Sequence, residues 1–390
     1  MNASESPGAV LPAPPLPAYG TGSLAEVVPS ILASLEQPGY EDALGLGESS
    51  AVCLFLVDGL GWEPLARGVA EAPFLTEAAR GARSVTTAFP STTVTSFATL
   101  GTGLPPGRHG LVGYSLALQG YERPMNLLRW TVSGADLRTE VVPEEFQPEP
   151  TLYERAASHG LRAAALGDGE HARSGLTRAT LRGTDFLPVY SPGDVAAVAA
   201  DAFREGTRLV HAYYPGLDIT GHLRGSQSEA WALEMGHVDR IAADLAERLP
   251  EGGTLIVTGD HGMLDVREDQ KVDLSRRPEL LEGVRAVAGE PRARYVYTQP
   301  SAETDVLAAW REALGDRMWV VSKKEAIAAG WFGPGVADRV RPRIGDVIAA
   351  AREPVAVVQR DSEGLMAALI GHHGSLTPEE QLVPLIIVRA

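Results

Sequence analysis

The 390-residue sequence predicts a doubly wound α/β fold, in which helices flank a buried, mostly parallel sheet. Three short apolar runs support this prediction, and each is followed by Asp, Gly, His or Pro. They occupy residues 51–57, 207–214 and 254–258. A stretch of helical character separates the last two runs at residues 228–249. A fourth apolar run, at residues 382–389, would add another strand.

Residues 265–365 interrupt this pattern with charged, proline-containing sequence that still holds strand-like runs such as ARYVYTQ and PVAVVQR. We interpret this stretch as a smaller α+β cap, inserted into a main core of residues 23–264 and 366–390. A second excursion, residues 115–150, is expected to lie near the site. The proline-rich extension at residues 1–22 predicts an extended strap or a loose tail.

The composition favours a folded protein that does not bind duplex nucleic acid. Apolar residues make up 44% of the chain and charged residues 22%, which are ordinary globular values. The net charge of −16 and the lack of any Lys/Arg-rich run argue against a broad basic face. No segment has the length of a membrane span, and the N-terminus lacks the basic start of a signal peptide. We therefore expect a cytoplasmic protein that does not bind membranes.

The single cysteine, Cys53, excludes an intrachain disulfide and lies inside the apolar run AVCLFLV. No activating base or cation flanks it in sequence, so we interpret it as a small core residue and not as a catalytic thiol. The sequence also gives no support for sulfatase chemistry, which needs a modified Cys or Ser in a Cys/Ser-x-Pro-x-Arg pattern.

Aspartate follows each of the first three predicted strands, and histidine follows the second and third, at the positions where ligands bind in open α/β sheets. Asp58 follows the first run, and Asp218 and His222 lie four residues apart after the second. Asp260 and His261 follow the third run, between two glycines. Each alone could be a turn, a cap or a solvated charge. Together they offer the carboxylate and imidazole groups that bind transition metals.

Two further segments add candidates for the site. His372 and His373 precede the last predicted strand, where either could complete a metal site, and a surface histidine pair is the alternative. Thr93 lies near the start of a predicted helix that runs to Gly101. Backbone N–H groups at a helix N-terminus favour an anion, although threonine there can also serve only as a cap.

The order of these segments resembles the alkaline phosphatase superfamily, in particular its nucleotide pyrophosphatase/phosphodiesterase branch. The resemblance spans residues 52–388 and is carried by VDGLGW, FPSTTVTSFATLGTGLPPGRHG, LDITGH, VTGDHGM and HHGSLTPEEQLVPLI. In that family a proline lies three residues before the nucleophilic threonine, and a T-G-x-x-P-x-x-H-G run follows it. Pro90 and residues 102–110 match this frame, which selects Thr93 over Thr92. The resemblance implies an alkaline-phosphatase-like core with an inserted cap.

The resemblance also implies two metal ions, most simply Zn²⁺, with Mn²⁺ as an alternative. The family's histidine directly precedes a glycine, so His373 before Gly374 is chosen over His372, whose role stays open. The implied ligands of one ion are Asp218, His222 and His373. Those of the other are Asp58, Asp260, His261 and the oxygen of Thr93.

The implied reaction is hydrolysis of a small-molecule phosphate ester, such as a nucleotide, through a phosphothreonine at Thr93. The phosphodiesterase branch usually has an asparagine about twenty residues beyond its nucleophile, where this chain has Gly113 and Tyr114. The Tyr114 hydroxyl could bind a phosphoryl oxygen in its place. A phosphodiesterase or nucleotide pyrophosphatase is our first hypothesis, and a phosphonate hydrolase or phosphomonoesterase is the alternative. A non-catalytic metal-binding protein is the third.

Overall fold

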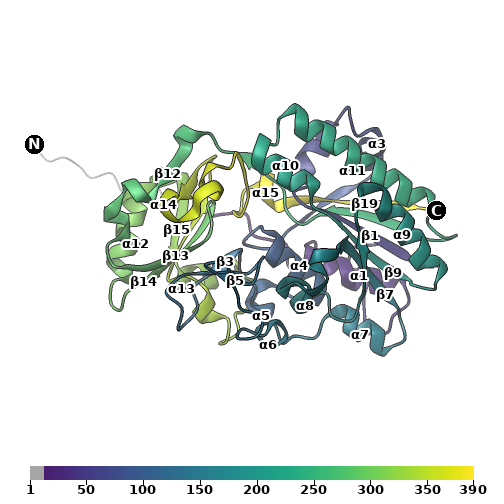
Figure 1. The fold of residues 1–390 in the computed structure, drawn as a ribbon, viewed down its shortest axis with the longest axis horizontal. Helices are drawn as coiled ribbons and strands as arrows, with labels where there is room; N and C mark the ends of the chain where they lie inside the picture. The colour runs from purple at the N-terminus through teal and green to yellow at the C-terminus, as the bar shows by residue number, and fades with distance from the viewer. Residues whose placement is uncertain (1–12) are drawn as a thin grey trace, which may run out of the picture.

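The computed structural model describes residues 13–390, so residues 1–12 of the predicted N-terminal extension lie outside the described residues. Its centre is a seven-stranded sheet in which β19 alone runs antiparallel to its neighbours (Figure 1). The strands, in order across the sheet, are β2 (Arg83–Thr86), β19 (Leu382–Arg389), β10 (Thr254–Gly259), β1 (Val52–Val57), β9 (Leu209–Tyr214), β7 (Ala163–Asp168) and β8 (Asp185–Val189). The predicted doubly wound, mostly parallel α/β fold is confirmed.

The four apolar runs in the sequence form β1, β9, β10 and β19, whereas β7 and β8 were not predicted. β7 begins with three alanines, which have a weak preference for strands. β8 lies at the edge of the sheet and contains Pro188, whose missing N–H is tolerated there. Both strands therefore form through their pairing with β9 and with each other, and not through a local signal.

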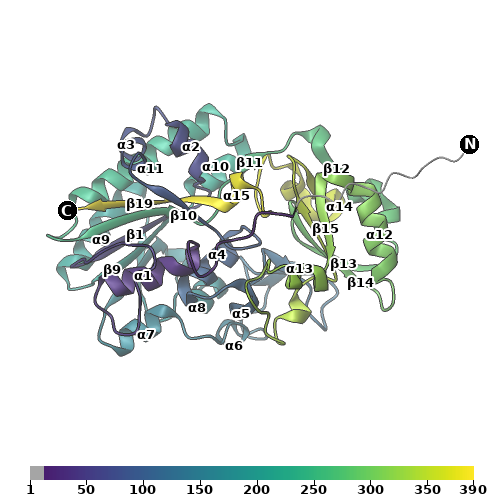
Figure 2. The ribbon, with the colours of Figure 1, turned by 180° about the vertical axis from the view of Figure 1, so that it is seen from behind.

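Alternate side chains of β1 enter two separate cores, because successive residues of a strand point to opposite faces. Leu54 and its even-numbered neighbours pack into one core, and Phe55 and its odd-numbered neighbours into the other. Helices cover both faces of the main sheet (Figures 1 and 2). The first group of helices is α1 (Val27–Ser34), α4 (Thr93–Thr102), α7 (Leu152–Ser158) and α8 (Gly175–Thr180). The second is α2 (Trp62–Arg67), α3 (Pro73–Ala79), α9 (Pro192–Arg204) and α11 (Glu229–Glu247). Cys53 belongs to the second core, where burial raises the pKa of its thiol to about 12.

A second, antiparallel sheet forms within the segment predicted as a cap, residues 265–365. In Figure 1 it lies beside the main sheet, on the left. Its strands, in order, are β13 (Val284–Glu290), β14 (Ala293–Thr298), β16 (Val347–Ala351) and β15 (Met318–Ser322). The helices α12 (Glu303–Leu314) and α13 (Lys323–Ala328) accompany it. Val296, Trp310 and Val347 belong to a hydrophobic core of its own.

Short elements connect the two sheets. Antiparallel pairing joins β11 (Leu264–Asp265) to β18 (Gly371–His372), and parallel pairing joins β12 (Lys271–Asp273) to β17 (Ala356–Val358). The excursion at 115–150 forms a four-stranded meander of β3 (Ser115–Leu116), β4 (Met125–Asn126), β5 (Thr131–Val132) and β6 (Ala135–Asp136). The remaining helices are α5 (Pro106–His109), α6 (Pro143–Phe146), α10 (Gly216–Arg224), α14 (Arg360–Glu363) and α15 (Pro378–Gln381).

Tyr19 ties the described part of the N-terminal extension to the rest of the chain. Its hydroxyl donates to the carbonyl of Trp331 at 3.3 Å and accepts from the N–H of Phe89 at 3.1 Å. Residues 13–22 therefore act as a strap. Between residues 13 and 390, no helix combines the length and the apolar character that a bilayer crossing requires.

A fully buried ion pair joins the second sheet to the main core. Arg292 lies in the turn between β13 and β14, and its guanidinium donates to both carboxylate oxygens of Glu380 in α15, at 2.7 and 2.9 Å. Glu380 also accepts from the N–H of Ser375 at 2.9 Å and from the hydroxyl of Thr377 at 2.7 Å. The pair thus fixes the loop that follows His373.

Replacing Arg292 by alanine should lower the free energy of unfolding by about 3–5 kcal/mol, because Glu380 would stay buried without its cation. Equilibrium denaturation of the variant and the parent measures this change. As a control, Arg267→Ala removes an exposed partner of Asp269 and should leave stability unchanged within error. An equally small effect for Arg292→Ala would contradict the role given to the buried pair.

Candidate active site

Three neighbouring parallel strands end level with one another, and the candidate metal ligands follow these ends. Val57 of β1 pairs in register with Gly259 of β10 and with Tyr214 of β9. Asp58 follows the first strand directly and Asp260 the second. The third leads into α10, which carries Asp218 and His222. Because the strands are parallel, their carboxyl ends meet at one edge of the sheet.

Gly59 permits the close approach of these loops. Its φ of +75° lies in the left-handed region, and a Cβ there would lie 3.0 Å from the Cα of Asp218. Any larger residue would both strain the turn and push α10 away. The glycine that follows the first-strand aspartate is therefore required by packing.

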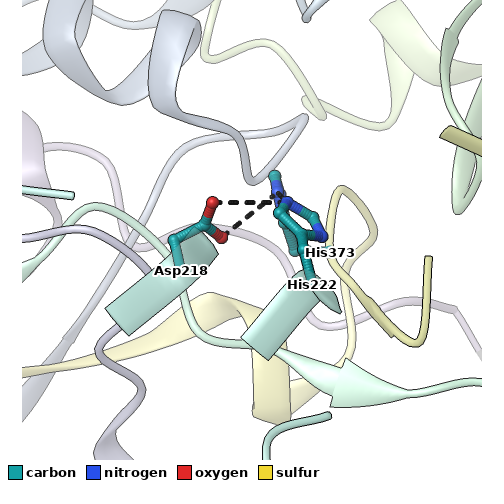
Figure 3. A group of neighbouring side chains, drawn as sticks. All are labelled: Asp218, His222 and His373. Carbon is teal, nitrogen blue, oxygen red and sulfur yellow. Dashed lines mark hydrogen bonds and ion pairs between the residues drawn. The ribbon is translucent and has the colours of Figure 1, made fainter. Parts of the chain in front are cut away.

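The structure brings the predicted residues into two overlapping groups, whose ligand atoms lie within 4.8 Å of one another. One group holds Asp218, His222 and His373 (Figure 3), with the Nε2 atoms of His222 and His373 at 3.3 and 3.9 Å from the Asp218 carboxylate. The other group holds Asp58, Asp218 and His261. Asp260 adjoins it, with Oδ2 at 3.5 Å from Nε2 of His261. Asp218 thus belongs to both groups, although the family resemblance implied that it binds one ion.

The three histidines are oriented alike. Nδ1 contacts the carbonyl of Gly371 at 2.7 Å in His222, that of Gly262 at 3.0 Å in His261, and that of Ser91 at 2.8 Å in His373. A carbonyl can only accept, so each Nδ1 carries the proton and each Nε2 is left with a lone pair. This arrangement is typical of metal-binding histidines. Burial lowers the pKa of His373 well below its ordinary value, which keeps the imidazole neutral.

His372 is placed differently from His373. Its Nε2 contacts the carbonyl of Leu369 at 3.0 Å, and the residue belongs to neither group. Burial lowers the pKa of His372 to about 3, so the ring is neutral at physiological pH. The structure therefore places His373 in the cluster and gives His372 a contact within its own loop.

Three carboxylates lie close together in this buried site, and the surrounding residues offer too few hydrogen-bond donors for all of their oxygens. Oδ1 of Asp58, Oδ1 of Asp218 and Oδ2 of Asp260 are buried and accept no hydrogen bond from residues 13–390. Burial, followed by the charges of Asp260 and Asp218, raises the pKa of Asp58 well above its ordinary value. Burial likewise raises the pKa of Asp260. Divalent cations would remove this conflict, so the donor set fits the metal ions that the sequence implies.

Thr93 is the first residue of α4, and Thr92 is its N-cap. The Thr93 Oγ1 atom lies 3.5 Å from Oδ2 of Asp58 and 3.4 Å from Nε2 of His261. The side chain thus reaches the second metal group from the N-terminus of a helix, where backbone N–H groups are available to an anion.

Tyr213 and Asn126 are among the residues at the site that were not predicted from the sequence. Tyr213 of β9 donates its hydroxyl to Oδ2 of Asp58, and it lies on the strand that the sequence did predict. Asn126 of β4 donates to the hydroxyl of Tyr114 at 2.5 Å. The only signal for Tyr213 is a phenol at the end of a buried strand. Asn126 reaches Tyr114 because β3 and β4 form a hairpin in which Ser115 lies opposite Asn126. The spacing of these residues in the sequence does not reveal this pairing.

Two cavities meet at Thr93 and Asp218. One, of about 940 Å³, lies toward the second sheet and is also lined by Tyr114, His373 and Glu290. The other, of about 640 Å³, lies over the carboxyl ends of the core strands. Its wall includes the aromatic residues Phe97, Phe186 and Tyr213. Thr93 therefore forms part of the wall of both cavities.

Comparisons with known proteins agree with this geometry. The family model for type I phosphodiesterase / nucleotide pyrophosphatase matches residues 52–376. Murine ectonucleotide pyrophosphatase / phosphodiesterase 5 has a similar structure, both alone and as an inactive threonine-to-alanine variant in complex with AMP. The two murine structures are 20% and 19% identical to the chain, each with a TM-score of 0.67, and the human protein is 18% identical with a TM-score of 0.66. Each match covers 86% of this chain and 87% of the other. No curated protein sequence matches the chain.

Replacing His373 by alanine should lower the zinc bound after reconstitution from about two ions per chain to about one, because one group loses an imidazole. Elemental analysis of the purified variant measures the metal content. His372→Ala, the matched control at the neighbouring position, should retain about two ions. Equal losses in the two variants would contradict the assignment of His373.

Asp58→Asn should raise the melting temperature of the metal-free protein by a few degrees at neutral pH. The pKa of Asp58 in the folded protein lies above its ordinary value of 3.8. The stability that the protonated carboxyl provides is therefore fully present below pH 3.8, and it is lost as the pH rises through the folded pKa. Asparagine carries no such charge. With zinc present the order should reverse, because the amide is a poor ligand. Thermal melts in chelator and in zinc measure both effects, and a metal-free variant that is less stable than the parent would contradict the prediction.

Proposed function

Because the chain belongs to the type I phosphodiesterase / nucleotide pyrophosphatase family, we propose that Thr93 is the nucleophile of this phosphodiester hydrolase. The observation that carries the proposal is the position of the Thr93 hydroxyl. It lies within 3.5 Å of Asp58 and His261 at the start of α4. A free threonine hydroxyl is a poor nucleophile at neutral pH, so it needs such an activating environment.

The family is metal-dependent, and the candidate ligands form two groups around Asp218. We assign one ion to Asp218, His222 and His373, and the other to Asp58, Asp260, His261 and the oxygen of Thr93. When bound, divalent ions at these positions would favour the ionised Thr93 hydroxyl and offset the negative charge of the phosphoryl group. The mixed Asp/His ligands favour zinc, with manganese as the alternative.

The residues of the chain have separate roles in the proposed reaction. The Thr93 hydroxyl gives up its proton as its oxygen attacks phosphorus in line, the bond from phosphorus to the leaving oxygen breaks, and the leaving oxygen takes up a proton. Backbone N–H groups at the start of α4 face the phosphoryl oxygens. Water then cleaves the phosphothreonine, which releases a phosphomonoester and restores the hydroxyl of Thr93. Tyr213 holds the carboxylate of Asp58 in place during both steps.

The two cavities favour a diester over a monoester. A diester has two substituents, and two adjoining cavities, which share Thr93 and Asp218 in their walls, offer room for both. The aromatic wall of the core-side cavity, with Phe97 and Phe186, suits a planar group such as a base. AMP, bound in the murine structure, is a phosphomonoester of the kind that hydrolysis of a nucleotide diester would release, which supports a nucleotide-containing substrate. Tyr114 lines the other cavity with its hydroxyl bound to Asn126, so the pair could present a donor where the family usually has asparagine.

Thr93→Ala should lower the turnover of bis(p-nitrophenyl) phosphate by about 10³-fold or more, because no other hydroxyl occupies this position. Thr93→Ser keeps a hydroxyl and should retain measurable turnover. Elemental analysis of both variants shows whether their metal content is preserved. Full turnover by Thr93→Ala would exclude Thr93 as the nucleophile. Faster turnover of p-nitrophenyl phosphate or phosphonoacetate than of the diester by the parent would favour the alternative reactions.

A further inference from the structure

Glu290, the last residue of β13, places a buried carboxylate beside the nucleophile. The residue is 4% exposed and lines the larger cavity together with Thr92 and Thr93. Its Oε1 atom accepts the N–H of Tyr114 at 2.6 Å. Its Oε2 atom is buried and accepts no hydrogen bond within the described part of the chain. One oxygen therefore holds the Tyr114 loop, and the side chain of Thr92, next to the nucleophile Thr93, also interacts with the carboxylate.

Two glycines adjoin the side chain of Glu290. A Cβ at Gly374, which follows His373, would lie 3.0 Å from the Cβ of Glu290. A Cβ at Gly113 would lie 3.5 Å from its Oε2. Both glycines have positive φ, of +128° and +141°. Glu290 thus fits between the loop that carries His373 and the loop that carries Tyr114.

No cation neutralises Glu290 directly. It forms no ion pair with any residue from 13 to 390. Arg294, whose charge acts on Glu290 from β14, instead pairs with Glu363 at 2.6 Å and donates to the carbonyl of Val357 at 2.7 Å. The negative charge of Glu290 therefore acts on whatever enters the cavity beside Thr93, with little solvent to screen it.

We propose that Glu290 is a specificity-determining residue that disfavours phosphomonoesters and so directs the site toward phosphodiesters. This inference rests on the proposed function. A phosphomonoester carries a charge of about −1.5 to −2 at neutral pH, whereas a diester carries one negative charge. Repulsion by a buried carboxylate grows with the charge of the substrate, so it penalises the monoester more.

The test compares two esters in the metal-loaded enzyme and in Glu290→Gln. Glutamine keeps the size of the side chain and an oxygen that can accept the Tyr114 N–H, but it removes the charge. Burial raises the pKa of Glu290 to about 7, so assays at about pH 8.5 compare an ionised glutamate with neutral glutamine. The ratio of kcat/KM for p-nitrophenyl phosphate to that for bis(p-nitrophenyl) phosphate should rise about tenfold in Glu290→Gln.

Three further variants separate the effect of charge from an effect on structure. Glu290→Asp keeps the charge and should keep the ratio near that of the parent. Glu290→Ala removes the charge and should raise the ratio, which keeps the test valid if Glu290→Gln does not fold. Glu122→Gln neutralises an exposed carboxylate of the same cavity, where solvent screens the charge, and should change the ratio less than about twofold.

The failure of this inference can be told apart from the failure of the proposed function. A ratio that stays within about twofold of the parent in a folded Glu290→Gln or Glu290→Ala variant, with diester turnover retained, would overturn the role of Glu290 alone. A parent enzyme loaded with zinc or manganese that hydrolyses neither ester would contradict the proposed function itself.

Discussion

The mutual repulsion of Asp58, Asp218 and Asp260 is the constraint around which this site is organised. The level register of β1 and β10 brings Asp58 and Asp260 to the same edge of the sheet, and α10, which follows β9, brings Asp218 to them. Burial removes the water that would otherwise screen them. Burying these carboxylates therefore lowers the stability of the metal-free protein at neutral pH. Cations that bind the folded site would restore that stability. The carbonyl contacts of the three histidines fit the same constraint, since each leaves Nε2 free for an ion.

The turn between β13 and β14 combines an anchor with a contribution to the site. Arg292 forms the fully buried pair with Glu380, which in turn holds the loop after His373. Glu290, two residues earlier, faces the cavity instead. Because Arg292 fixes the turn against the core, Glu290 is fixed relative to Thr93 as well. An inserted segment can thus influence which ester is accepted without supplying any of the candidate metal ligands.

The sequence predicted the features that depend on local pattern. The apolar runs that became β1, β9, β10 and β19 have the composition of buried strands, and the turn residues after them marked Asp58 and Asp260. Features that depend on pairing between distant segments were missed. The alanine-rich β7 is a strand because it pairs with β9. Asn126 meets Tyr114 because β3 and β4 form a hairpin, and Glu290 arrives from a separate sheet. The choice of His373 over His372 came from the family pattern, and of the two it is His373 that lies near Asp218 and His222.

Residues 91–102, which comprise α4 and the two residues before it, limit which positions can determine substrate specificity. Every residue of α4 is buried, so the nucleophile sits on a helix that cannot shift without disturbing the core. The hydroxyl of Ser96 in the same helix donates to the carbonyl of Asp260 at 2.6 Å. The carbonyl of Ser91, which precedes the helix, accepts the Nδ1–H of His373. One segment therefore holds residues of both metal groups, and a change in it would alter nucleophile and metal ligands together. Tyr114 and Glu290 touch the cavity without belonging to that framework. Substrate preference can consequently change at those two positions while the candidate catalytic residues stay in place.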